Sequence, residues 1–459
     1  MLSEPAHHTS QTSAALQYQY DLVCIGFGPA SLAIAIALHD REIKARVLYI
    51  ERQRTFVWHA GMLLPNARMQ ISFLKDLATL RNPRSKFTFV NYLKSKNRLV
   101  AFTNLSTFLP LREEYNDYMS WCASHFEQDV QYGHETICVS PAENRMGPIQ
   151  AWRVLSKNVE TNETNTVTAR SVVIAIGGKP RIPPALSTGG LDCRIIHSSL
   201  YSKAAPSILT DASKAHNVAV IGGGQSAAEI FNDLQSRYPN SYITLYTGAS
   251  ALKPSDDSPF VNEIFDPERV DMFYDLPTES RLKTIWSDKA TNYGVVRPEL
   301  LDRMYENMYH QRLHEPDQSK WQYKIVAWRE VVGFETCSDR RIRLKLKNTS
   351  KGEITMSDSS FDLAVLGTGY ERNGHETLLE PARHLFRESR YAVERNYKVK
   401  FRKDAVASDC GIWLQGCCED SHGLSDTLLS ILAVRGGEMV DAIFPMQSPG
   451  PGKSGCAKL

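Results

Sequence analysis

The stretch that decides the fold is YDLVCIGFGPAS, residues 20–31. An apolar run ends at Gly26 and Gly28, and Pro29 then opens the helical pattern SLAIAIALHD. Glycines at such a strand-to-helix turn let the backbone approach a pyrophosphate, whose charge the first N–H groups of the helix stabilise. The next expected strand, residues 45–50, ends at Glu51, the spacing at which an acidic residue accepts hydrogen bonds from a ribose. The pattern predicts a dinucleotide-binding unit for an unphosphorylated ribose, as in FAD or NAD.

A second fingerprint lies near the middle of the chain. The apolar run NVAVI, residues 217–221, precedes Gly222, Gly224, Gln225 and Ser226. The following strand, residues 242–246, ends in Thr247-Gly248, without the carboxylate that would repel a 2′-phosphate. This absence favours NADPH over NADH, although neither residue is basic and Lys253 is the nearest cation beyond the strand.

Strands that alternate with helices predict an α/β protein with two Rossmann-like domains. We expect an NADPH-binding domain over residues 214–331, inserted into a discontinuous FAD-binding domain over 18–213 and 332–445. The β-like segment 324–361 and DLAVLGTGY, residues 362–370, are expected to return the chain to the first domain. Residues 255–313 form a small helical, substrate-binding part, and residues 1–17 and 446–459 form flexible tails.

Composition and charge exclude several classes of protein. With 53 basic and 51 acidic residues the net charge is +2, so no basic surface for nucleic acid is indicated. The apolar run from Leu22 to Leu38 is broken by glycines and Pro29, which argues against a membrane span. The nine cysteines contain no C-x-x-C pair, so neither a metal site nor a disulfide framework is expected.

Ordered blocks of sequence then point to a family. WH (58–59), MLLP (62–65), MQISFLKDL (69–77), KPSDDSPFVNE (253–263), KATNY (289–293), LGTGY (366–370) and HGLSDTLLS (422–430) together closely resemble the flavin-dependent N-hydroxylating monooxygenases. Within that family the blocks are most similar to the fungal L-ornithine N(5)-monooxygenases of siderophore biosynthesis. The resemblance covers about residues 20–445.

The resemblance implies hydroxylation of the side-chain amine of L-ornithine with NADPH, FAD and O2, through a C4a-hydroperoxyflavin. The attacking nitrogen must be neutral, and an alkyl amine of pKa about 10.4 costs about 3 kcal/mol to deprotonate at pH 8. A desolvating pocket lowers this cost. The resemblance also implies a homo-oligomer, namely a tetramer.

The resemblance also assigns roles to individual residues of this chain. The resemblance implies that Met69, Gln70 and Asn292 serve catalysis, and that Lys75, Asn262, Asn292 and Ser425 bind the substrate. It implies that the cofactors are bound by Gly26, Gly28, Pro29, Glu51, Trp58, His59, Gln70, Gly222, Gly224, Gln225, Ser226, His422, Gly423 and Leu424. Without the resemblance, Lys75 reads as a surface lysine, the asparagines and Ser425 as helix caps, and Met69 as core filling.

Three alternatives stay open at this point. A lysine or diamine hydroxylase of the same family differs by about one methylene of substrate length, worth only about 1–3 kcal/mol. A non-catalytic FAD/NADP redox sensor is the alternative from another class. The C-terminal residues Ala457-Lys458-Leu459 resemble a peroxisomal address, so both the peroxisome and the cytoplasm are considered.

Overall fold

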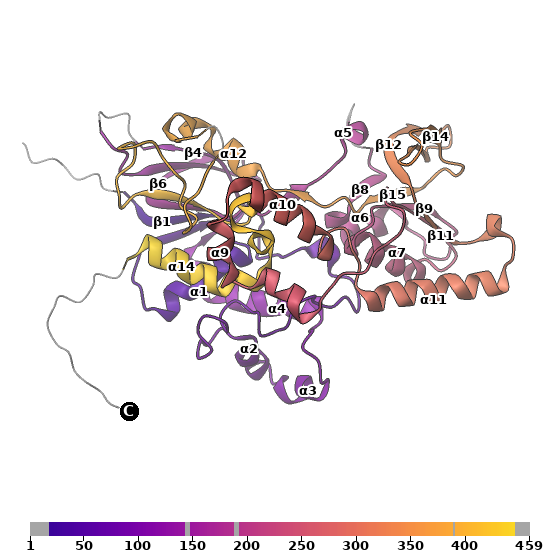
Figure 1. Cartoon of the computed structure of the whole chain (residues 1–459), viewed down its shortest axis with the longest axis horizontal. Coiled ribbons are helices and arrows are strands. Elements are labelled where there is room, and N and C mark those ends of the chain that lie inside the picture. Colours follow the sequence, from indigo (N-terminus) through magenta and orange to yellow (C-terminus); the bar gives the residue numbers. More distant parts are fainter. Residues whose placement is uncertain (1–17, 143–146, 188–191, 389–390, 446–459) are drawn as a thin grey trace, which may run out of the picture.

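The computed structural model describes residues 18–142, 147–187, 192–388 and 391–445. Two lobes follow one another along the long axis of the molecule, each built on its own sheet. The helices α9 (Arg269–Tyr274) and α10 (Thr278–Asp288) lie near the junction between them (Figure 1). We call the lobe that contains β1 (Tyr20–Ile25) the first lobe and the lobe that contains β9 (Asn217–Ile221) the second lobe.

The first lobe has a seven-stranded sheet in the order β3-β2-β1-β6-β5-β4, with β17 also paired to β6. The strands β1 (Tyr20–Ile25), β2 (Val47–Ile50), β3 (Val130–Gln131), β6 (Thr164–Ile174) and β17 (Gly411–Leu414) pair in parallel. The strands β4 (His134–Pro141) and β5 (Trp152–Asn158) extend the sheet in antiparallel fashion. Carboxyl ends of the parallel strands therefore meet at one edge, where nucleotides bind in such folds.

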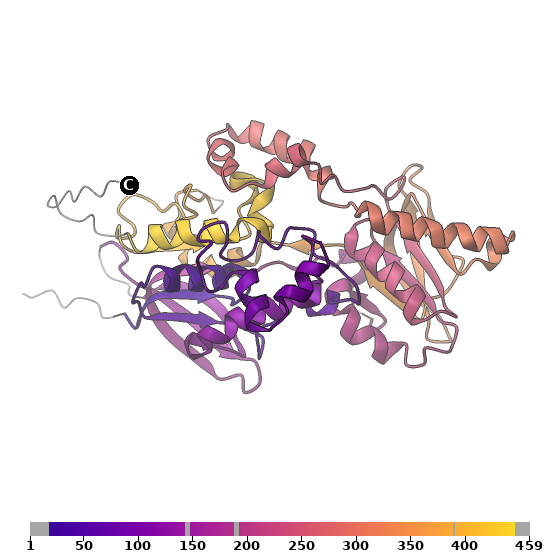
Figure 2. The ribbon, with the colours of Figure 1, turned by 90° about the horizontal axis from the view of Figure 1, so that it is seen from below.

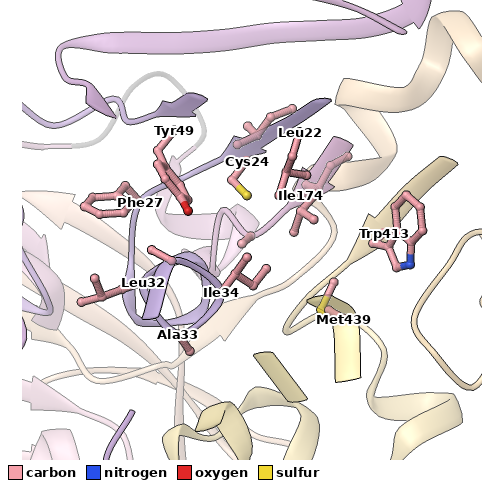
Figure 3. Packing of buried hydrophobic residues seen from close by; sticks show 14 of the residues in the cluster. Leu22, Cys24, Phe27, Leu32, Ala33, Ile34, Tyr49, Ile174, Trp413 and Met439 are labelled. Carbon is pink, nitrogen blue, oxygen red and sulfur yellow. The ribbon is translucent and has the colours of Figure 1, made fainter. Parts of the chain in front are cut away.

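Helix α1 (Pro29–Asp40) is buried because it lies between the sheet and α14 (Leu432–Ile443). Its side chains from Ser31 to Leu38 are all buried, which explains the unbroken apolar run in the sequence. Close approach of the two helices requires Gly436, whose added Cβ would lie 2.9 Å from the carbonyl oxygen of Ala33. Figure 3 shows this core, with Ile34 of α1 on the side that faces Met439 of α14 and Trp413 of β17, and Leu32 on the opposite side of the helix.

The second lobe has a five-stranded parallel sheet in the order β11-β10-β9-β15-β8. Its strands are β8 (Ile195–His197), β9 (Asn217–Ile221), β10 (Tyr242–Tyr246), β11 (Tyr323–Val326) and β15 (Leu363–Leu366). The helices α6 (Tyr201–Ile208), α7 (Gln225–Arg237) and α11 (Pro298–His314) contact this sheet. A smaller antiparallel sheet of β12 (Arg329–Thr336), β13 (Ile342–Asn348) and β14 (Ile354–Met356) packs against it.

The strand pairing differs from the expected boundaries at residues 213/214 and 331/332. Strands β8 and β15 complete the second sheet, and β12 to β14 share a hydrophobic core with β9 and β10. The expectation that 324–361 and DLAVLGTGY return to the first lobe was therefore wrong. The physical reason is that β9 needs a neighbour on each side, and β15 supplies one of them through Ala364 and Val365.

Residues 255–313 form short helices, as expected, but they divide between the lobes. The elements α8 (Pro259–Asn262), α9 (Arg269–Tyr274) and α10 (Thr278–Asp288) accompany two 3₁₀ helices, η4 (Glu263–Phe265) and η5 (Lys289–Thr291). Helices α9 and α10 contact α13 (Glu419–His422) of the first lobe, whereas α11 packs on α7. Figure 2 shows this segment bridging from α11 to the first lobe.

Shorter elements connect these layers. They are η1 (Ala60–Met62), α2 (Phe89–Ser95), α3 (Leu99–Asn104), α4 (Arg112–Ala123), η2 (Ser124–Asp129), β7 (Lys179–Pro180), α5 (Pro184–Ser187), η3 (Ser198–Leu200), η6 (Gln318–Lys320), β16 (Tyr370–Glu371), α12 (Gly374–Leu379), η7 (Glu380–Leu385), η8 (Leu424–Thr427) and η9 (Leu429–Ile431). Among the residues described, no helix has the length and apolar character needed to cross a bilayer. The predicted tails fall outside the described ranges.

Candidate functional site

The first glycine loop has the geometry of a pyrophosphate site. Gly26 has φ +88° and an added Cβ there would lie 2.6 Å from the carbonyl oxygen of Ala175, so a side chain is excluded. Gly28 caps α1 without a side-chain hydrogen bond, and no described atom lies within 4 Å of an added Cβ at that position. Pro29 occupies the first turn, where its missing N–H has no cost. The loop therefore leaves space and free N–H groups for an anion at the start of the helix.

Glu51 is fixed beside this loop. Its carboxylate accepts hydrogen bonds from the backbone N–H groups of Phe27, at 2.7 Å, and of Gln53, at 2.8 Å. A carboxylate has about four acceptor positions, so the remaining ones stay available for ribose hydroxyls. The structure thus places Glu51 where the sequence predicted.

A buried amide at the same edge of the first sheet supports a ligand there. Gln415 follows β17, and its backbone N–H donates to the carbonyl oxygen of Ile174 at the end of β6. Its side chain is 3% exposed, yet neither its Oε1 nor its Nε2 has a hydrogen-bond partner within the described part of the chain. An unpaired buried amide is costly. A polar cofactor such as FAD, lying along the carboxyl edge beside Gly26, would satisfy it.

The second glycine loop repeats this geometry on the second sheet. Gly222 has φ +143° and an added Cβ would lie 2.4 Å from the carbonyl oxygen of Gly367. Gly224 caps α7, and an added Cβ there would lie 3.4 Å from the Cα of Gly294. The start of α7, with Gln225 and Ser226, can thus receive a second pyrophosphate.

The Gln225 side chain is committed to protein contacts. Its Nε2 donates to Glu229 Oε1 and its Oε1 accepts from the backbone N–H of Arg297, both at 2.9 Å. The amide of Gln225 is therefore engaged by the protein, and its two contacts brace the start of α7.

The segment after Glu51 lies between the two lobes. His59 adopts the left-handed conformation, with φ +46°, and an added Cβ on Gly61 would lie 1.9 Å from the carbonyl oxygen of Ser199 in the second lobe. Trp58 and His59 lie edge to face, with ring centroids 5.3 Å apart. Left-handed non-glycine residues are often found at functional sites.

His59 is held neutral by its surroundings. The protein atoms crowded around its ring, and the charges of Arg112 and Arg372, lower the pKa of His59 to about 4. Its Nδ1 lies 3.4 Å from the hydroxyl of Tyr370.

Met69 and Gln70 sit on the next part of this segment. Met69 is 5% exposed, and its backbone N–H donates to the carbonyl oxygen of Pro110 at 2.9 Å. Gln70 is exposed. Met69 therefore belongs to the core, whereas Gln70 faces outward.

Three contacts bring the predicted substrate residues together. Lys75 Nζ lies 3.7 Å from Asp266 Oδ1, four residues beyond Asn262. The helices η4 and η8 contact each other, which brings the segment of Asn262 against that of Ser425. The segment of Asn292 joins them because the Tyr293 hydroxyl lies 2.6 Å from Thr427 Oγ1. Residues far apart in the sequence therefore share one region.

The expected helix-cap roles are only partly seen. Asn262 lies at the end of α8 and its Nδ2 donates to the carbonyl oxygen of Asp257 at 2.8 Å. Ser425 is 3% exposed and lies inside η8, whose cap is Gly423. Ser425 is therefore not an N-cap, and its side chain is buried.

The side chain of His422 is buried and contacts other parts of the protein. Its ring stacks on Tyr397 with centroids 4.0 Å apart, and its Nε2 donates to the carbonyl oxygen of Arg395 at 3.0 Å. Burial lowers the pKa of His422 to about 4. Gly423 has φ +84°, and an added Cβ would lie 3.4 Å from the ring of Phe273. The buried Leu424 packs in the same small core as Phe265 and Ile285. The ring of His422 is therefore engaged by Tyr397 and Arg395 of the protein itself.

The sequence interpretation missed a fully buried ion pair behind Ser425. Arg435 Nη1 lies 2.8 Å from Asp426 Oδ1, and Asp426 Oδ2 also accepts from the backbone N–H of Cys418 at 2.7 Å. The signal that could have found it is Arg435 itself, a charge within the apolar helix LAVRGGEMV. Among the residues described, no group of three or more His, Cys, Asp or Glu side chains is arranged to hold a metal ion.

Comparison with known proteins identifies the family. Residues 18–372 match the model of the family described as L-lysine 6-monooxygenase/L-ornithine 5-monooxygenase. The chain belongs to this family.

Individual family members match over nearly the whole chain. An L-ornithine N(5)-monooxygenase from Ajellomyces capsulatus is 53% identical over 431 residues, which cover 93% of this chain and 91% of that protein. The ornithine hydroxylase of Pseudomonas aeruginosa has a solved structure with a TM-score of 0.84 and 38% identity, covering 92% of this chain and 98% of that one. An ornithine N-hydroxylase from Kutzneria sp. 744, solved with reduced FAD, NADP+ and L-ornithine, has a TM-score of 0.83 and 35% identity, with 92% and 98% coverage. The predicted α/β fold with two Rossmann-like sheets is therefore confirmed.

Proposed function

We propose that this member of the family hydroxylates the side-chain amine of L-ornithine, with NADPH and O2 as co-substrates and FAD as cofactor, giving N(5)-hydroxy-L-ornithine for hydroxamate siderophores. The observation that carries the proposal is the convergence of the segments that contain Lys75, Asn262, Asn292 and Ser425. The names of the relatives support the substrate and both nucleotides.

The two loops would hold the two nucleotides. Gly26, Gly28 and Glu51 form the FAD site, and Gly222, Gly224 and the start of α7 form the NADPH site. FAD bound at the first loop would supply the redox chemistry, namely two-electron transfer from NADPH and activation of O2. Trp58 and Met69 lie on the segment after Glu51, and the buried Met69 would help to exclude water from the reacting atoms.

Lys75 would bind the α-carboxylate of the amino acid. Its ammonium is only partly exposed and already lies near one carboxylate, that of Asp266. A charge-assisted hydrogen bond of this kind is worth about 1.5–3 kcal/mol. The amides of Asn262 and Asn292 would complete the amino-acid end, and Ser425 would lie at the amine end.

The surroundings of Ser425 favour a neutral amine. Ser425 lies beside Leu424 and the small hydrophobic cluster of Phe265 and Ile285. Desolvation of an amine disfavours its charged form and lowers its pKa. Ser425 can then accept an N–H of the neutral amine, which orients the nitrogen and leaves its lone pair free for reaction.

L-Lysine or a diamine is the alternative substrate, because the family description includes a lysine monooxygenase. A non-catalytic FAD/NADP sensor is disfavoured, since a sensor has no need for the amino-acid site at Lys75, Asn262 and Ser425. The yield of hydroxylamine per NADPH with L-ornithine and with L-lysine distinguishes the two substrates.

A homo-oligomer, namely a tetramer, is also proposed. Its support is the exposure of large apolar side chains on the bridging helices, where Phe260 is 84% and Trp286 is 82% exposed. Such residues mark interaction surfaces when they cluster. Light scattering after size exclusion tests this, and a monomer at micromolar concentration would contradict it.

Peroxisomal import is the last proposal on function, with the cytoplasm as the alternative. Ala457-Lys458-Leu459 lie outside the described residues, so the support is the sequence alone. Fusing the last residues to a fluorescent protein should give punctate fluorescence that overlaps a peroxisomal marker. Diffuse fluorescence would contradict import.

A further inference from the structure

One carboxylate joins the two lobes beside the second glycine loop. Glu229 of α7 binds Arg112, the first residue of α4, through two parallel contacts: Nη1 to Oε2 at 2.8 Å and Nη2 to Oε1 at 2.9 Å. The side chains are 9% and 13% exposed, respectively. Arg112 Nη1 also donates to the carbonyl oxygen of Met62 at 3.0 Å. The guanidinium thus links α7 to the segment between the lobes.

The same carboxylate also reaches the nucleotide loop. Glu229 Oε1 accepts from Gln225 Nε2 at 2.9 Å, and Gln225 Oε1 accepts from the backbone N–H of Arg297 at 2.9 Å. Arg297 Nη1 in turn lies 2.6 Å from Asp257 Oδ2, and the carbonyl oxygen of Asp257 accepts from Asn262 Nδ2. A continuous chain of polar contacts therefore runs from α4, through the start of α7, to the segment of a predicted substrate residue.

These contacts hold two backbone segments in place: the start of α7 and the segment that contains Met69. Gln225 is the first residue of α7, and its cap, Gly224, makes no side-chain hydrogen bond. At the other end, the backbone N–H of Arg112 donates to the carbonyl oxygen of Ala67 at 2.7 Å, two residues before Met69. The carboxylate between Arg112 and Gln225 therefore connects the loop to the Met69 segment.

We propose that Glu229 is a positioning residue for the NADP(H) loop. It holds the N-terminus of α7, through Gln225, at a fixed distance from the segment that contains Met69 and Gln70. The proposal rests on the proposed function only in that the second loop binds NADP(H). A role confined to stability is the alternative, although buried ion pairs are by themselves poor stabilisers compared with apolar packing.

The test measures NADP+ binding to the purified FAD-loaded protein, without turnover, by titration calorimetry and by the change in flavin absorbance. Gln225→Leu removes both amide contacts but leaves the pair of Arg112 and Glu229 intact, so the protein is expected to fold. Glu229→Gln keeps the shape of the side chain but removes its charge. We expect the Kd for NADP+ to rise about tenfold in each variant, as for the loss of one charged hydrogen bond. The double variant should show less than the product of the two effects because both residues act through one network.

Two readouts separate positioning from stability. The limiting rate of flavin reduction at saturating NADPH should fall in both variants, since saturation restores occupancy but not alignment. The exposed Glu306 on α11 gives the matched control, and Glu306→Gln should bind NADP+ as the wild type does. A folded Gln225→Leu protein with unchanged Kd and unchanged reduction rate would overturn the proposal, as would effects of the two variants that simply multiply. A wild-type protein that binds NADP+ but hydroxylates no amine would contradict the proposed function. The test of Glu229 would still be valid, because it measures NADP+ binding and flavin reduction.

Discussion

Lys75 Nζ lies 3.7 Å from Asp266 Oδ1, although 190 residues of sequence separate them. This contact joins the segment after the first nucleotide unit to the helices that bridge the lobes. Lys75 is also fixed through its backbone, because its carbonyl oxygen accepts from the hydroxyl of Tyr115 at 3.3 Å. A lysine held in this way presents a defined positive charge rather than a mobile surface group.

Replacing Lys75 by alanine should weaken substrate binding more than any other step. We expect the KM for L-ornithine to rise about 10- to 100-fold, as for the loss of one charge-assisted hydrogen bond. Flavin reduction by NADPH without ornithine should stay within about twofold of wild type, because Lys75 lies on no nucleotide loop. Stopped-flow and steady-state kinetics measure the two quantities. The exposed Lys203 supplies the control variant, Lys203→Ala, and an unchanged KM in Lys75→Ala would remove this residue from the site.

Tyr293→Phe should loosen the segment that carries Asn292. The Tyr293 hydroxyl lies 2.6 Å from Thr427 Oγ1, and burial raises the pKa of Tyr293 to about 12, so the group stays protonated during assays. Loss of this hydrogen bond is worth roughly 0.5–1.5 kcal/mol. We therefore expect kcat/KM for ornithine to fall about 2- to 12-fold, with the Kd for NADP+ unchanged. Tyr305→Phe, at an exposed position on α11, should have no effect. The prediction fails if both variants behave alike.

The stability of the protein should fall on acidification because of His422. Burial lowers the pKa of His422 to about 4, whereas an unfolded histidine titrates near 6.5, so the unfolded state binds more protons between these pH values. The free energy of unfolding should therefore decrease as the pH falls from about 6.5 to about 4, by about 3 kcal/mol from this residue. Urea unfolding across this range measures the slope. His422→Gln should flatten the slope and the exposed His310→Gln should not; equal slopes in all three proteins would contradict the assignment.

Gly248→Arg should increase the preference for NADPH. An added Cβ at Gly248 meets only Thr349 Cγ2, at 3.6 Å, among the described atoms, so a longer side chain fits after β10. A guanidinium at the end of this strand can pair with a 2′-phosphate. We expect the Kd for NADP+ to fall about tenfold, while that for NAD+ stays constant. Equal tightening of both nucleotides would show that the new charge does not contact the 2′-phosphate.

The sequence predicted the two nucleotide units well because their determinants are local. Gly26 and Gly222 need positive φ and a close backbone neighbour, and the residues around them carry that requirement within a few positions. The resemblance also selected Lys75 and Asn262, which the structure brings near each other. Their site roles stay predictions until tested.

The membership of β15 could not be predicted in the same way. Its apolar run suits either sheet, and only pairing with β8 and β9 decides between them. The contacts of Glu229 with Arg112 were likewise hidden, because an acidic residue on a helix 117 positions from an arginine carries no local signal of its partner. Non-local pairing, rather than local propensity, separates what the sequence predicted from what it did not.

The most direct test of the account measures NADPH oxidation by the purified FAD-loaded protein, with L-ornithine or L-lysine, together with chemical detection of the hydroxylamine. We predict that ornithine yields hydroxylated product in near-equal amount to the NADPH consumed, and that lysine yields little product and mainly hydrogen peroxide. Equal or better coupling with lysine would favour the alternative substrate. NADPH oxidation that gives hydrogen peroxide but no hydroxylated amine with either compound would contradict the central claim.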